Sequence, residues 1–397
     1  MRSDRLGETL LPKRLALPVF ASDALSSVAY APDEILLTLG LAGGALALTS
    51  SWKIALAVVV VMVVVIMSYR QNVHAYPSGG GDYEVASVNL GPKAGLTVGS
   101  ALLVDYVLTV AVSVSSGVQN AATAFTFVQG REAVIAVAIV VALTAMNLRG
   151  VRESGTAFAL PVYLFMVTIL GMALFGFYRQ ATGTLPQAES ASLELLPEPG
   201  YEAIGGLALG FLMLRAFSSG CAALTGVEAI SNGVPAFRRP KSRNAATTLL
   251  LMGAISISML MSMVGLARLT GINYAEDPAT QLTRDGVPVG DAYVQDTVMG
   301  QVAKAVFSDF DLGVVLVSIV TGLILVLAAN TAFNGFPVLG SILARDGFLP
   351  RQLHTRGDRL AFSNGIVILA TAAAALIVAY DAEVTRLIQL YIVGVFV

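Results

Sequence analysis

Long apolar runs separated by short polar segments dominate the chain. A bilayer core of roughly 30 Å needs about 20 consecutive apolar residues, because a helix rises 1.5 Å per residue. Runs of about this length recur through the sequence. We predict ten spanning helices, at about 15–42, 52–72, 95–127, 132–147, 157–178, 203–233, 245–268, 311–333, 362–380 and 385–397. The pattern therefore predicts an all-α polytopic membrane protein.

The same pattern leaves no segment for a soluble domain. The two longest polar segments, 181–202 and 269–304, are acidic loops between predicted spans. The last apolar run reaches Val397 without a polar tail, so we expect the natural chain to continue. We predict one transmembrane domain over 1–397 that ends inside its tenth helix, with C-terminal helices and any cytoplasmic domain absent.

Composition excludes several classes of protein. Hydrophobic residues make up 56% of the chain and charged residues 13%, against roughly 25% charged residues in a soluble domain. The net charge is −2 and the mean hydropathy is +0.76. These values exclude a soluble enzyme, a disordered protein and a nucleic-acid binder with a basic face. Cys221 stands alone, and His74 and His354 lie far apart, so we expect no disulfide, metal centre or cofactor.

The distribution of basic residues predicts the orientation. Of the 24 lysines and arginines, sixteen fall in segments on the N-terminal side of the membrane, seven fall in the opposite segments, and Arg215 lies within a span. Cytoplasmic segments of membrane proteins carry the excess of Lys and Arg. We therefore place the N-terminus inside. The polar first 14 residues precede a long apolar run with no small-residue cleavage site, which argues against a cleaved signal peptide.

Small and polar residues interrupt the first and sixth predicted spans. Residues 18–32 and 217–235 are rich in Ser, Gly and Pro, where a spanning helix is normally aliphatic. The two segments take matching positions in two five-helix halves, at about 15–178 and 203–397. Paired interruptions of this kind indicate a transporter with inverted repeats and a site near the middle of the membrane. The alternative is that small residues only permit close helix packing; the acid in each segment favours the transporter.

Three carboxylates are candidates for the chemistry of this site. An acid in the membrane centre costs roughly 2.5–3.5 kcal/mol on insertion scales, and such acids are usually functional. Asp23 lies in the interrupted part of span one, Asp105 in span three, and Glu228 in span six. Asp33 and Glu34 lie nearer the outer end of span one, and we expect them at the membrane interface.

Span three carries a polar face. Tyr106, Thr109 and Ser113 are spaced so that they share one side of a helix. Thr and Ser hydroxyls can instead bond the carbonyls of their own helix, but Tyr106 cannot. Together with carboxylates and the carbonyls freed at two helix breaks, these hydroxyls are hard oxygen ligands. Such ligands suit an alkali cation that has lost its water, and a carboxylate among them can also carry a proton.

Other features have simpler explanations. Gly79–Gly81 lacks the Lys and the strand of a phosphate-binding loop, so we expect a tight inner loop there. The basic run 237–243 either binds anionic lipid or a cytoplasmic ligand, or only anchors the inner side of the membrane; we favour the anchor. Arg215 either extends to the membrane surface or pairs with an acid.

Several segments resemble the amino acid–polyamine–organocation superfamily, namely 21–30, 75–83, 328–337 and 344–350. Two motifs are more specific: Ser-Asp-Ala-x-Ser-Ser-x-Ala-Tyr at 22–30 and Asp-Tyr-x-x-Thr at 105–109. They resemble the bacterial KimA-type branch of the KUP family of potassium–proton symporters. The resemblance covers nearly the whole chain.

The resemblance implies a fold of two inverted five-helix repeats with helices 1 and 6 broken. It implies proton-coupled potassium import by alternating access across a bacterial cytoplasmic membrane. Carried over residue by residue, the implied potassium site consists of Asp23, Tyr30, Tyr106, Thr109, Ser113, Thr225 and Glu228. The resemblance makes Tyr391 a gate, and Asp105 fits a family pattern without a firm role. Because a desolvated carboxylate can carry a proton, Glu228 and Asp23 are the candidates for the coupling acid.

The resemblance also implies partners besides membrane lipid and the potassium ion. In the family, a cytoplasmic domain beyond the transmembrane helices dimerises the protein and binds a cyclic dinucleotide; this sequence does not contain it. We expect no nucleic-acid partner. One departure from the branch is the long segment 269–304, which either shapes the outer mouth or is a solvated insertion; we favour the insertion.

Other functions remain as alternatives. An amino acid permease of the same fold would be stabilised by amino acids rather than by cations. A channel would dissipate gradients, and the paired broken helices argue against it; a non-transporting sensor is the related alternative. An enzyme is least favoured, because no nucleophile–base pair or metal cluster is visible in the sequence.

Overall fold

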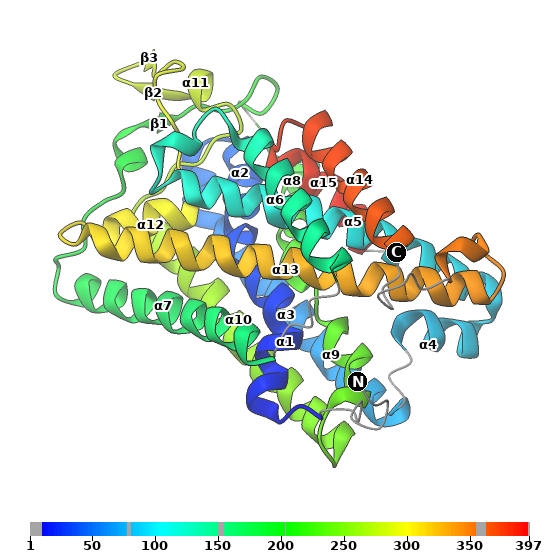
Figure 1. The fold of residues 1–397 in the computed structure, drawn as a ribbon. Helices are drawn as coiled ribbons and strands as arrows, with labels where there is room; N and C mark the ends of the chain where they lie inside the picture. The colour runs from blue at the N-terminus through cyan, green and yellow to red at the C-terminus, as the bar shows by residue number, and fades with distance from the viewer. Residues whose placement is uncertain (1–9, 78–80, 150–154, 203, 355–362, 396–397) are drawn as a thin grey trace.

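The structure is a computed structural model, and it describes residues 10–77, 81–149, 155–202, 204–354 and 363–395. Long helices make up most of the described part, and three short strands lie at the end of the molecule away from the N-terminus (Figure 1). We call these two ends the N-terminal side and the sheet side. The predicted all-α architecture is confirmed, since the strands are only two or three residues long.

Each predicted span coincides with a helix or with a broken pair of helices. Among the described residues, six segments are long and apolar enough to cross a membrane, and they fall in α3 (Gly44–Ala75), α5 (Pro92–Ala122), α7 (Gly155–Ala181), the segment Gly206–Asn232, α10 (Lys241–Leu269) and α13 (Asp311–Arg345). Two shorter apolar helices are α6 (Glu132–Leu148) and α14 (Ser363–Ala379). The remaining predicted spans are the broken first span and α15 (Val384–Val395).

The first span is interrupted in its middle. It consists of α1 (Lys13–Ser26), the 3-10 turn η2 (Ser27–Ala29) and α2 (Ala31–Gly40). Pro32 lies in the first turn of α2, where an N–H has no partner within the helix, so this proline favours a helix that begins here. The predicted interruption of this span is confirmed.

The sixth span is interrupted at the corresponding place. It consists of α8 (Gly206–Gly220), the 3-10 turn η5 (Cys221–Leu224) and α9 (Glu228–Asn232). Between η5 and α9, Thr225 is extended and Gly226 has a φ of +77°, a left-handed conformation that glycine adopts without strain. This second interruption is also confirmed.

The order of elements repeats in the two halves of the chain. A short helix follows the second span of each half: α4 (Gly81–Leu90) in the first and α12 (Val298–Val306) in the second. Equivalent spans pack in pairs, α3 against α10 and α5 against α13. Gly117 and Gly322 bring α5 and α13 close, because a Cβ on either glycine would lie 3.4 Å from the carbonyl oxygen of the other. The arrangement agrees with the predicted inverted repeat.

The two long polar loops meet on the sheet side. Strand β1 (Glu194–Leu195) pairs antiparallel with β2 (Leu282–Arg284), which pairs with β3 (Val287–Pro288). The remaining short turns are η3 (Thr126–Val128), η4 (Glu189–Ser192), η6 (Val234–Ala236), α11 (Pro278–Gln281) and η7 (Arg351–Leu353).

The favoured interpretation of 269–304 as a solvated insertion is wrong for α12. Nearly every residue of this helix is buried, and it packs against α2, α7, α10 and α13. The segment therefore covers the sheet-side ends of the spans and shapes that mouth, which was the other alternative.

Two further expectations change. Helix α13 was expected to end near 333 but continues to Arg345, with Pro337 buried inside it and several other helices packed against it. The expected tight loop at Gly79–Gly81 lies largely outside the described residues, and Gly81 already begins α4.

Candidate functional site

A chain of hydrogen bonds joins the two helix breaks. The Tyr30 hydroxyl donates to Ser27 Oγ over 3.0 Å, and Ser27 Oγ lies 2.9 Å from Thr225 Oγ1. Thr225 Oγ1 in turn donates to the carbonyl of Ala222 over 3.0 Å. All of these side chains are buried. The structure thus brings the predicted residues Tyr30 and Thr225 together, with Ser27 between them.

Asp23 packs directly against the break in the sixth span. A Cβ on Gly226 would lie 2.8 Å from Asp23 Cβ and 2.6 Å from the backbone nitrogen of Ala24, so only glycine fits there. The Asp23 carboxyl is buried, and its Oδ1 has no hydrogen-bond partner. A buried, unsatisfied carboxylate oxygen is costly unless a cation or a proton occupies it.

Helix α5 contributes its polar face to the same region. Thr109 Oγ1 lies 3.0 Å from the hydroxyl of Tyr391, which comes from α15, and both side chains are buried. Ser113 is buried one turn further along α5. The Tyr106 ring fills the space above Gly335 of α13, where a Cβ would lie 2.6 Å from ring carbons.

Four carboxylates come from the two broken spans and from helices α4 and α5. Asp23, Asp82, Asp105 and Glu228 lie within electrostatic range of one another. In the part of the chain that the structure describes, no Lys or Arg forms an ion pair with any of them, and no three of them are close enough to hold one metal ion. The acids therefore lie near one another without forming one chelating cluster.

Asp82, in α4, was not predicted as a site residue. The Tyr69 hydroxyl of α3 donates to its Oδ2 over 2.8 Å. Burial raises the pKa of the Asp82 carboxyl, and the bond from Tyr69 opposes that rise. Asp82 follows Gly81 directly, so its position at the end of the glycine run is the only sequence signal that could have suggested it.

Other positions that shape this region were also missed by the sequence analysis. Ser27 bridges the two breaks, yet nothing in the sequence separates it from its neighbour Ser26, which bonds the Asp23 carbonyl. Gly226 and Gly335 leave room for the side chains of Asp23 and Tyr106 that pack against them. Such contacts between distant segments leave no local pattern in the sequence.

The predicted interfacial position of Asp33 and Glu34 is wrong. Both side chains are buried on the sheet side of the break. The backbone N–H of Val298, at the start of α12, donates to Asp33 Oδ2 over 3.3 Å. The prediction failed for Asp33 because α12, from a segment 265 residues away, covers it. Arg215 is exposed on α8 and lies within electrostatic range of Glu34.

We expect Tyr391→Phe to keep the fold but weaken the contact between α5 and α15. The change removes a buried hydrogen bond with Thr109, which should lower the free energy of unfolding by about 1–3 kcal/mol. Thermal unfolding of the purified protein measures this loss, and Tyr178→Phe, at a residue 62% exposed, is the matched control. Equal stability of the two variants would contradict the role of the Thr109 contact.

Comparisons with known proteins place this chain among membrane transporters. The family model of amino acid permeases matches residues 19–397. The potassium transporter KimA of Bacillus subtilis (strain 168) is 43% identical over 397 residues, which cover all of this chain and 61% of that protein. The resemblance seen in the motifs is thus confirmed. Among solved structures, a mutant manganese transporter from Eremococcus coleocola matches with a TM-score of 0.47 and 15% identity, over 95% of this chain and 75% of that one.

Proposed function

The chain belongs to the amino acid permease family, and from this premise we propose that it imports potassium ions together with protons, by alternating access across a bacterial cytoplasmic membrane. The chain spans about three fifths of the length of its curated potassium-transporting relative. The substrate and the coupling of the whole protein are therefore part of the proposal.

The observation that carries the proposal is the oxygen-lined junction of the two helix breaks. Hydroxyls of Tyr30, Ser27 and Thr225 join the breaks, and the unsatisfied carboxyl oxygen of Asp23 lies beside them. These hard oxygens suit a potassium ion without its hydration shell. An amino acid would bring its own carboxylate toward Asp23, and no described Lys or Arg pairs with that acid to compensate.

We assign the potassium site to the seven residues carried over from the family resemblance. They are Asp23, Tyr30, Tyr106, Thr109, Ser113, Thr225 and Glu228. The buried contact between Tyr391 and Thr109 supports a gating role for Tyr391. Glu228 is our first choice for the coupling acid, because it begins α9 next to the break and is less buried than Asp23, the second choice.

The excess of basic residues on the N-terminal side supports an orientation with the N-terminus in the cytoplasm. The sheet side then faces outward. Since the relative is longer than this chain, we also propose that a further cytoplasmic domain dimerises the protein and binds a cyclic dinucleotide, as the family resemblance implies.

Rubidium uptake into proteoliposomes containing the full-length protein tests the function. We expect an inward proton gradient to stimulate the uptake, and potassium to compete with it. Uptake of labelled amino acids, with no cation uptake in the same preparation, would place the chain with the permeases instead. Cation uptake that only follows its own gradient would indicate a channel.

A further inference from the structure

Asp33 and Glu34 form a second pair of acids, separate from the proposed potassium site. They lie in the first turn of α2, and their exposed fractions are only 7% and 2%. Consecutive residues of a helix point about 100° apart. Asp33 accordingly faces α12 and Tyr274, whereas Glu34 faces Thr385 of α15 and Arg215 of α8.

The Asp33 carboxyl is satisfied on one oxygen only. Its Oδ2 accepts the backbone N–H of Val298, the first residue of α12, and the Tyr274 hydroxyl lies within hydrogen-bonding range of the carboxyl. Its Oδ1 is buried and has no hydrogen-bond partner. A carboxylate would leave negative charge on this bare oxygen. A neutral acid removes this charge and keeps Oδ2 as the acceptor.

The surroundings supply Asp33 with little positive charge. The charged and titratable groups near the two acids are Tyr274, Glu276 and Arg215, with Asp296 next to Tyr274. Glu276 and Asp296 are carboxylates, Tyr274 is a phenol, and Arg215 faces Glu34. Lys304 on α12 is paired with Asp296. Within the described ranges, no Lys or Arg forms an ion pair with Asp33.

Two opposing effects act on Asp33 while α12 covers it. Burial without a cation disfavours the carboxylate. The positive end of α12 and the N–H of Val298 favour it. If α12 moves away, water reaches the carboxyl and the charged form is no longer penalised.

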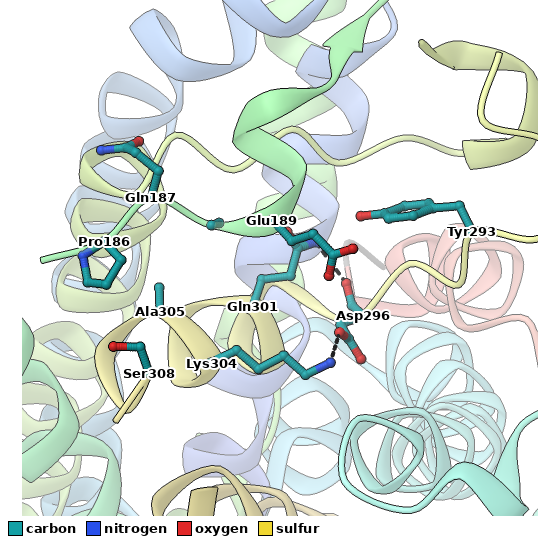
Figure 2. Close-up of a pocket in the computed structure, with 10 residues that line it drawn as sticks. Pro186, Gln187, Glu189, Tyr293, Asp296, Gln301, Lys304, Ala305 and Ser308 are labelled. Carbon is teal, nitrogen blue, oxygen red and sulfur yellow. Dashed lines mark hydrogen bonds and ion pairs between the residues drawn. The ribbon is translucent and has the colours of Figure 1, made fainter. Parts of the chain in front are cut away.

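Helix α12 has space beside it. A cavity of about 140 Å³ lies between α12 and the segment 186–189. Figure 2 shows this cavity, with the ion pair of Lys304 and Asp296 at its edge. The cavity leaves part of the α12 face around Lys304 and Ala305 without packed neighbours.

We propose that Asp33 binds a proton from the sheet side each time α12 closes over it, so that closure of this gate depends on the pH of the outer solution. The inference rests on the proposed function and orientation, in which the sheet side faces outward. It assigns Asp33 a role different from that of Glu228, which couples the proton to potassium.

Rubidium exchange across proteoliposomes tests this role. With the full-length protein, equal rubidium on both sides and the inner pH clamped, we expect wild-type exchange to slow as the outer pH rises. The slowing should exceed about fivefold, the lower end of ordinary coupling between two sites. Asp33→Asn is always neutral, so its exchange should lose this fivefold dependence on outer pH and keep only the dependence that arises at Glu228, and its proton-driven accumulation should persist. A wild-type pH dependence in Asp33→Asn would overturn the proposal.

Glu34→Gln is the matched control, because Glu34 is also buried on the same turn but has its hydrogen bond to Thr385 of α15; it should keep the wild-type pH dependence. Infrared difference spectra between acidic and alkaline pH provide a readout independent of transport. The carbonyl band of one protonated carboxylic acid should be missing in Asp33→Asn and present in Glu34→Gln. If Asp33→Asn does not transport, loss of that band supports the proposal and its retention refutes it. If wild-type protein does not transport rubidium, the proposed function fails and the same spectra decide whether Asp33 binds a proton.

Discussion

Gly226→Val is expected to abolish transport and to lower the free energy of unfolding by about 3 kcal/mol or more. A left-handed backbone conformation costs a non-glycine residue roughly 1–3 kcal/mol, and a β-branched side chain is among the worst placed there. The φ of Gly226 is +77°. Its new Cβ would also lie 2.6 Å from the nitrogen of Ala24, which would push the two helix breaks apart.

The control for this substitution lies in the same span. Gly210→Val on α8 adds the same side chain where no atom lies within 4 Å of the new Cβ. Thermal unfolding and rubidium uptake of the two purified variants make the comparison. If Gly226→Val were as stable and as active as Gly210→Val, the close contact between the breaks would have no functional importance.

Glu228→Gln is expected to eliminate proton-driven accumulation of rubidium while preserving rubidium exchange. Glutamine keeps the shape of the side chain but cannot carry a proton. Because Glu228 lies within electrostatic range of Asp105, Asp23 and Asp82, removing its charge should not destabilise the fold. Exchange should fall by less than about tenfold, the change that 1.4 kcal/mol of lost binding produces.

Glu84→Gln on α4 serves as the comparison for this variant, since Glu84 is an exposed acid near the same side of the molecule. It should accumulate rubidium as the wild type does. Accumulation against a gradient by Glu228→Gln would remove Glu228 from the coupling role and leave Asp23 as the remaining candidate.

The sequence predicted those features that depend on local composition. Runs of apolar residues located the spans, and the clusters of Ser, Gly and Pro around Pro32 and Gly226 located both breaks. The polar face of α5 placed Thr109 toward the interior, where it meets Tyr391.

Features that depend on contacts between distant segments could not be predicted in this way. Composition near the end of a span suggested that Asp33 was interfacial, but α12 buries it. Helix α13 runs past Pro337 because packing outweighs the local preference of proline for helix ends. Asp82 joins the site through Tyr69, a contact across two helices that leaves no periodic signal.

The close contact of Gly117 with Gly322 is a point about which α5 could tilt against α13. Thr109 lies eight residues from Gly117 along α5, a lever arm of about 12 Å at 1.5 Å per residue. A rigid tilt of roughly 15°, the size of known subunit rotations, would swing Thr109 by about 3 Å. Its bond to Tyr391 is 3.0 Å long, so a modest tilt of one helix about this glycine pair is enough to release it.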